Sequence, residues 1–114
     1  MNISEEYFDM VKQLVIATSE GKVNWKRQNP TTIYFEILTE NHESALISIQ
    51  KIRRPASVEY LFNVKNLTKD DVVVTIDSSN EREFQNLLAE LFNSANYSIE
   101  KRSIDFLSGI LKKI

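Results

Sequence analysis

The chain has 114 residues, 42% of them hydrophobic, a formal net charge of −2 at pH 7 and no cysteine. This length fits one globular domain, residues 1–114, and the lack of cysteine excludes both a disulfide framework and a thiolate zinc site. The chain begins with the acidic pair Glu5 and Glu6 where a secretory signal would be basic, and no apolar run approaches the ~20 residues of a membrane helix. We therefore expect a cytoplasmic protein that does not enter a membrane.

Residues 4–20 predict a helix, because apolar side chains recur there at steps of three and four. Gly21 follows the last periodic residue, and glycine commonly ends a helix in a left-handed conformation. Val23 and Trp25 then alternate with polar residues, which predicts a short strand whose tryptophan covers a sheet edge or the rim of the core. A phosphate-binding loop is not expected here, since such a loop precedes a helix and this segment follows one.

Four runs of alternating apolar and polar residues come next, at residues 33–38, 45–50, 58–65 and 72–77. Turn-forming residues separate these runs. Alternation in all four predicts an antiparallel meander with one buried face and one wet face. The predicted fold class is therefore α+β, a two-layer domain with a four- to five-stranded antiparallel meander and helices packed on one face, in the order α-β-β-β-β-β-α-α.

The last third of the chain predicts two further helices. The first follows Asn80 as its cap, and residues 93–98 are poor helix formers, so we expect a break there with Ser98 capping a third helix. The third helix carries a narrow apolar stripe at the spacing of an interhelical contact, formed by Ile104, Leu107, Leu111 and Ile114. Two alternatives remain open: this stripe packs on its own domain, or it forms the interface of a homodimer.

One short signature adds a resemblance. The helix is followed by Gly21, Lys22, Val23 and Trp25, then by the meander and by a closing pair of helices within residues 87–111. In this order of elements the chain resembles small uncharacterised bacterial α+β proteins. The resemblance extends over nearly the whole chain and implies the fold, but it carries no activity, cofactor or site residue.

The residue types that perform most enzyme chemistry are poorly placed in this sequence. His42 is the only histidine, and it lies at a predicted hairpin tip without the partners of a catalytic or metal-binding histidine. The paired carboxylates fall at helix starts and turns, where capping and solubility explain them. We therefore expect no catalytic residue, no metal site and no cofactor, and we expect that the protein is not an enzyme.

Two groups of residues are candidate partner surfaces. The first is basic and lies in the middle of the chain, where aromatic side chains close to it would suit single-stranded nucleic acid; it consists of Lys51, Arg53 and Arg54, with Lys22, Lys26 and Arg27. The second is apolar and falls on the outer phase of the sheet; it consists of Tyr34, Leu61 and Val73.

The pattern as a whole favours a non-enzymatic protein-interaction or regulatory module. A nucleic-acid-associated protein is the first alternative, against which stand a pI of about 5.4 and the lack of a known recognition motif. A secretion-chaperone-like binder is the second alternative. The predicted order of elements counts against it, since such chaperones usually interrupt their strands with a helix.

Overall fold

The structure is a computed structural model that describes the backbone of residues 3–114 and the side chains of residues 4–114. It contains two long helices, five strands and one short 3-10 helix. In chain order they are α1 (Ile3–Ser19), β1 (Lys26–Asn29), β2 (Thr32–Leu38), β3 (Ser44–Arg53), β4 (Val58–Asn66), β5 (Asp71–Asp77), η1 (Arg82–Phe84) and α2 (Gln85–Leu111). The α+β class and the antiparallel meander predicted from the sequence are confirmed.

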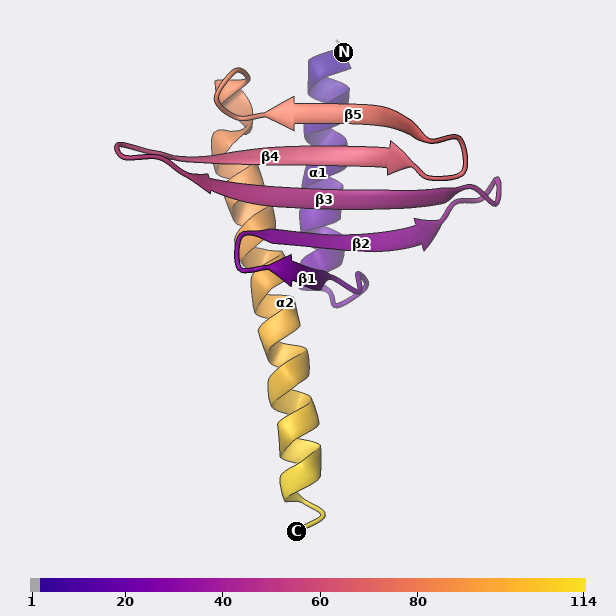
Figure 1. Ribbon diagram of the computed structural model, residues 1–114, viewed down its shortest axis with the longest axis vertical. Helices are drawn as coiled ribbons and strands as arrows, with labels where there is room; N and C mark the ends of the chain where they lie inside the picture. The colour runs from indigo at the N-terminus through magenta and orange to yellow at the C-terminus, as the bar shows by residue number, and fades with distance from the viewer. Residues whose placement is uncertain (1–2) are drawn as a thin grey trace.

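The five strands form one open sheet in the order β1-β2-β3-β4-β5, and each pairs antiparallel with its neighbour. Figure 1 shows the two helices side by side on one face of this sheet, running in the same direction and crossing the strands. Their starts are held together by Phe8 and Phe84, whose ring centroids are 5.5 Å apart. The domain therefore has two layers, and residues 3–114 place no helix on the other face of the sheet.

The core lies between the sheet and the two helices. Alternate residues of the strands point into it, as the period of two in a strand requires, and the large buried ones are Ile33, Phe35, Ile47, Ile49, Tyr60, Phe62 and Ile76. The helices contribute Val11, Val15, Leu87, Leu88, Leu91, Phe92 and Ala95 to the same cluster. Every buried side-chain nitrogen or oxygen of the described residues has a hydrogen-bond partner.

Gly21 ends α1 as predicted, with a φ of 76°. The Lys22 amide donates to the Ala17 carbonyl oxygen at 3.0 Å, and the Gly21 amide donates to the Thr18 carbonyl oxygen at 3.1 Å. These two bonds are the pair that defines a Schellman motif, which satisfies carbonyl groups left free at a helix end. The left-handed residue turns the chain from α1 towards the sheet.

The short strand predicted at Val23 and Trp25 is wrong, because regular pairing starts only at Lys26. Trp25 lies in the connection before β1 and is completely buried in the core, not at its rim. Its indole Nε1 donates to Thr18 Oγ1 at 3.0 Å, and its ring meets that of Phe35 edge-on, with centroids 4.7 Å apart. The tryptophan therefore joins the end of α1 to the sheet.

The predicted break at residues 93–98 is also wrong, since α2 is one continuous helix from Gln85 to Leu111. Poor helix formers cost only a few tenths of a kcal/mol each, and Ala95 in the middle of this segment is completely buried. Tertiary packing therefore outweighs the local preference. The helix also begins later than predicted, because the 3-10 turn η1 occupies the positions after Asn80 and Glu81.

Trp25 gives the first testable prediction. Substituting Trp25→Ala should lower the free energy of unfolding by about 3–5 kcal/mol, because it empties a fully buried site and removes the partner of Thr18. Chemical denaturation followed by far-UV circular dichroism measures the loss. The matched control is Tyr97→Ala, an aromatic residue that is 70% exposed, for which a change within about 0.5 kcal/mol is expected. Equal losses for the two variants would contradict the assigned role of Trp25.

Gly21 gives the second prediction. A Cβ added at this residue would meet no atom within 4 Å, so the cost of Gly21→Ala comes from the backbone conformation alone. A left-handed alanine should destabilise the fold by roughly 1–2 kcal/mol, and Gly21→Asn should cost less, because asparagine tolerates that conformation better. Thermal unfolding of the three proteins measures this order. An alanine variant as stable as the parent would show that the left-handed turn is not required.

Candidate functional site

The most distinctive surface of the molecule is the free end of α2. Figure 1 shows α2 running past β1, the last strand at that edge of the sheet, and continuing beyond the body of the domain. All residues from 101 to 114 are exposed. We call this segment, residues 101–114, the α2 projection. Its helical part, residues 101–111, extends for roughly 16 Å at 1.5 Å per residue.

The α2 projection exposes large apolar side chains. Their exposed fractions lie between 43% and 96%, and they are Ile104, Phe106, Leu107, Ile110, Leu111 and Ile114. At 100° per residue these side chains occupy roughly 160° of the helix circumference, which is almost one complete side. The four stripe residues predicted from the sequence are among them. Packing of this stripe on its own domain, one of the two predicted alternatives, is wrong.

The opposite side of the α2 projection is polar and mostly basic. It carries Lys101, Arg102, Asp105, Lys112 and Lys113. On the apolar side, Phe106 stands between two shallow grooves of about 490 Å³ each. Ile99 and Leu107 line one groove, and Ile110 and Ile114 line the other. The surface is therefore ridged and apolar, which suits contact with another apolar surface.

Polar contacts fix the direction in which α2 leaves the domain. The Arg102 guanidinium donates to the carbonyl oxygen of Trp25, and the Arg27 guanidinium donates to Asn96 Oδ1 at 2.5 Å and to Glu100 Oε1 at 2.9 Å. These contacts join α2 to β1 and to the connection before it. The helix is thus anchored where it crosses the sheet edge, and the apolar side beyond that point is held in a defined orientation.

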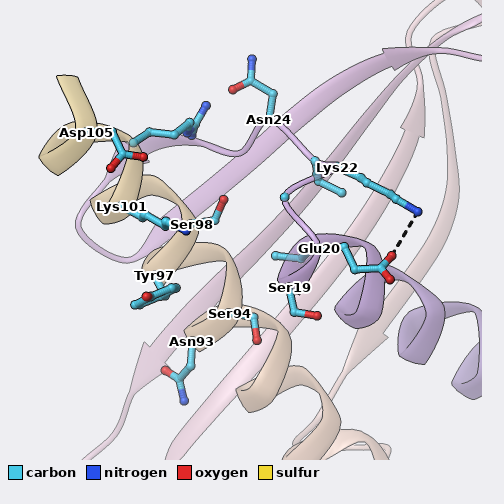
Figure 2. A pocket seen from close by; sticks show the side chains of 14 residues that line it. Ser19, Glu20, Lys22, Asn24, Asn93, Ser94, Tyr97, Ser98, Lys101 and Asp105 are labelled. Atoms are coloured by element: carbon cyan, nitrogen blue, oxygen red, sulfur yellow. Dashed lines mark ion pairs between the residues drawn. The ribbon is translucent and has the colours of Figure 1, made fainter. Parts of the chain in front are cut away.

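A polar cleft of about 610 Å³ lies on the other side of α2, between this helix and the end of α1. Figure 2 shows Tyr97, Lys101 and Asp105 on α2 and, across the cleft, the end of α1 and the loop after it, where Lys22 Nζ and Glu20 Oε1 form an ion pair at 3.1 Å. Each charged side chain that lines the cleft is exposed to solvent. Acid–base catalysis commonly uses charged groups withdrawn from water, and no charged side chain that lines this cleft is buried.

The apolar surface predicted on the outer sheet face is not continuous. Tyr34 pairs with Ser48 across β2 and β3, while Leu61 pairs with Gln50 across β3 and β4. Polar residues of β3 therefore separate the two apolar side chains. Val73 lies at an irregularity of the β4–β5 pairing, beside Lys65, further along the sheet. The strand order does not bring these three predicted residues together.

The predicted basic surface is divided as well. Lys51 lies on the helix-covered face, with its Nζ 5.7 Å from the centre of the Phe92 ring. Arg54 Nε donates to Glu59 Oε2 at 2.9 Å, and this carboxylate raises the pKa of the Arg54 guanidinium. Arg53 is exposed at the end of β3. Arg27 is bound to α2 and Lys22 to Glu20, so these cations do not form one field for a nucleic-acid backbone.

Other features of the described residues complete this description. His42 is exposed in the β2–β3 turn with a φ of 62°, as its predicted position at a hairpin tip implies. Among residues 3–114 no three histidine or carboxylate side chains gather in a group that could hold a metal ion. Neither long helix of this part of the chain is long and apolar enough to cross a membrane.

The chain matches no known protein family, no curated protein and no solved structure at a significant level.

The division of the basic residues gives the third prediction. A labelled single-stranded oligonucleotide should bind with a dissociation constant weaker than about 100 µM at physiological salt, which is weaker than ordinary nonspecific nucleic-acid binding. The double variant Arg53→Ala with Arg54→Ala should leave this affinity within a factor of about two. Fluorescence anisotropy measures both values. Binding at about 1 µM or tighter that the double variant abolishes would instead support a nucleic-acid function.

Proposed function

We propose that this chain is a non-enzymatic protein-interaction module that binds through the apolar side of the α2 projection. One observation carries the proposal: the domain completes its core with residues up to Ile99, yet α2 continues and exposes five more large apolar side chains, and Ile114 beyond its end exposes a sixth. A contiguous exposed apolar surface of this extent matches the largest patch of a typical monomer, and such patches are often functional. The lack of cysteine is compatible with a partner in a reducing compartment such as the cytoplasm.

The energetics support this reading. Burying one Leu, Ile or Phe side chain contributes about 1.5–3 kcal/mol, so covering this surface would release several kcal/mol. The anchoring of α2 by Arg27 and Arg102 lowers the conformational entropy that a partner would otherwise have to remove. A preoriented apolar helix side is a recurrent way for one protein to dock on a groove or helix of another.

The fourth prediction tests whether this surface contacts protein in the cell. A benzophenone side chain incorporated in place of Leu107 should form photo-cross-linked adducts with protein, either another species or a second copy. The matched control is the same group in place of Ile16 on α1, because Ile16 is 51% exposed and Leu107 58%. Gel electrophoresis after irradiation of intact cells should show adducts at least ~5-fold stronger at Leu107, since hydrophobic docking concentrates contact on one patch.

Equal yields at the two positions, or no protein adduct at either, would refute the proposed function. Both substitutions are on exposed helix positions, so the folded domain should be retained. Buried Trp25 supplies the check, because its fluorescence emission should stay at short wavelength in both labelled proteins.

A further inference from the structure

We propose that the occupant of the apolar side is a second copy of this chain, with the two α2 projections packed antiparallel around a two-fold axis level with Gly109. This inference rests on the proposed function, because it names the partner of the same surface. Isologous pairing around a two-fold axis is the commonest way in which a soluble protein covers an exposed patch with its own copy.

The available area is sufficient for such a pair. Burying one large apolar side chain contributes about 1.5–3 kcal/mol, and each Å² of buried apolar area contributes about 25 cal/mol. One such side chain therefore corresponds to roughly 60–120 Å² of apolar surface. The six apolar side chains of the α2 projection are mostly exposed, so one copy offers roughly 400 Å² of apolar surface and two copies about 800 Å². Apolar atoms form about 65% of a homodimer interface, so complete coverage of all six side chains would give an upper limit near 1,200 Å², which is the lower limit of a specific complex.

The spacing of the stripe is self-complementary in the antiparallel direction. In coiled-coil terms Ile104 and Leu111 occupy a positions and Leu107 a d position. Ile114 lies three residues beyond the end of α2, and the proposed pair requires residues 112–114 to extend the helix so that Ile114 takes the next d position. With the axis level with Gly109, Ile104 of one copy lies level with Ile114 of the other, and Leu107 lies level with Leu111. Every a position then meets an apolar d position, and no layer of the seam pairs an apolar side chain with a polar one.

The flanks of the stripe favour antiparallel over parallel packing. One flank is apolar through Phe106 and Ile110, while the other carries Lys101 and Ser108. Antiparallel helices place like flanks together, so Phe106 of one copy packs near Ile110 of the other. Parallel helices would set the apolar flank of one copy against the polar flank of its partner, which would bury less apolar surface.

Charge does not oppose the antiparallel pair. The two Lys101 side chains would lie roughly 24 Å apart along the helix axes, at 1.5 Å per residue. This separation exceeds the Debye length of about 8 Å at physiological ionic strength, so their repulsion is largely screened. Of the other basic side chains, Arg102 donates to the Trp25 carbonyl oxygen of its own domain, and Lys112 and Lys113 lie on the outer, solvated side of the helix pair.

The fifth prediction is a monomer–dimer equilibrium of the full chain with a dissociation constant on the order of 10 µM, measured by sedimentation equilibrium. The double variant Leu107→Glu with Leu111→Glu should weaken dimerisation at least ~100-fold, because it would place charges in the seam. Both positions are exposed in the single chain, so circular dichroism and Trp25 fluorescence should stay unchanged. The control variant Met10→Glu alters an equally exposed apolar residue on α1 and should leave the dimer intact.

Orientation is tested by thiol cross-linking, since the chain has no cysteine of its own. Ser108 and Lys101 lie on the same helix side, seven residues apart. In the antiparallel pair the two copies of residue 108 are offset by only about 3 Å along the axis, so Ser108→Cys should cross-link with a short bifunctional reagent and Lys101→Cys should not. In a parallel pair both variants would react alike.

Three results would overturn the inference: a chain that remains monomeric at about 500 µM, a dimer that persists in the double glutamate variant, or equal cross-linking at residues 101 and 108. A monomeric chain that still gives adducts with a different protein at position 107 would reject the second copy as occupant and leave the proposed function standing. Loss of both the dimer and the adducts would reject both.

Discussion

The burial of Trp25 is the interaction on which the arrangement of this domain depends. Its indole nitrogen donates to Thr18 at the end of α1, its ring packs against Phe35 in β2, and its carbonyl oxygen accepts from Arg102 in α2. One residue outside any regular element thus connects both helices and the sheet. Arg102 is the last of these contacting residues along the chain. Its contact with Trp25 therefore also marks the point at which α2 leaves the body of the domain.

Much of the fold is predictable because its signals are local. Alternation identifies β2 to β5, and Gly21 identifies the end of α1, since each depends only on neighbouring residues. The sequence places Trp25 in a strand, because the same alternation of apolar and polar residues can occur in a strand and in a short irregular segment. Two contacts distinguish the irregular segment from a strand, and neither follows from the local pattern. One is the side-chain hydrogen bond from Trp25 to Thr18, and the other is the contact with Arg102, which is distant in the sequence.

The candidate site was harder to predict, because it follows from the continuity of α2. Asn93, Ser94, Asn96 and Ser98 favour a break on propensity alone. In the folded chain Ala95 is buried and Asn96 accepts a hydrogen bond from Arg27, so tertiary contacts keep the segment helical. The spacing of the stripe residues is visible in the sequence, whereas their exposure beyond the sheet edge depends on the helix not folding back onto its own domain.

The apolar side of the α2 projection has two origins, and this explains its width. Phe92, Ile99 and Phe106 follow one another at seven-residue steps, and along this line the side chains pass from buried through half-buried to exposed. Phe106 therefore extends the face that α2 uses against its own sheet. Ile104, Leu107 and Leu111 add a second face at positions where the sheet-covered part of the helix carries Asn93, Tyr97 and Glu100, all of them exposed. The first face continues the side of α2 that packs in the core, whereas the second continues no buried position of α2. Packing within the single chain therefore does not account for the apolar character of the second face.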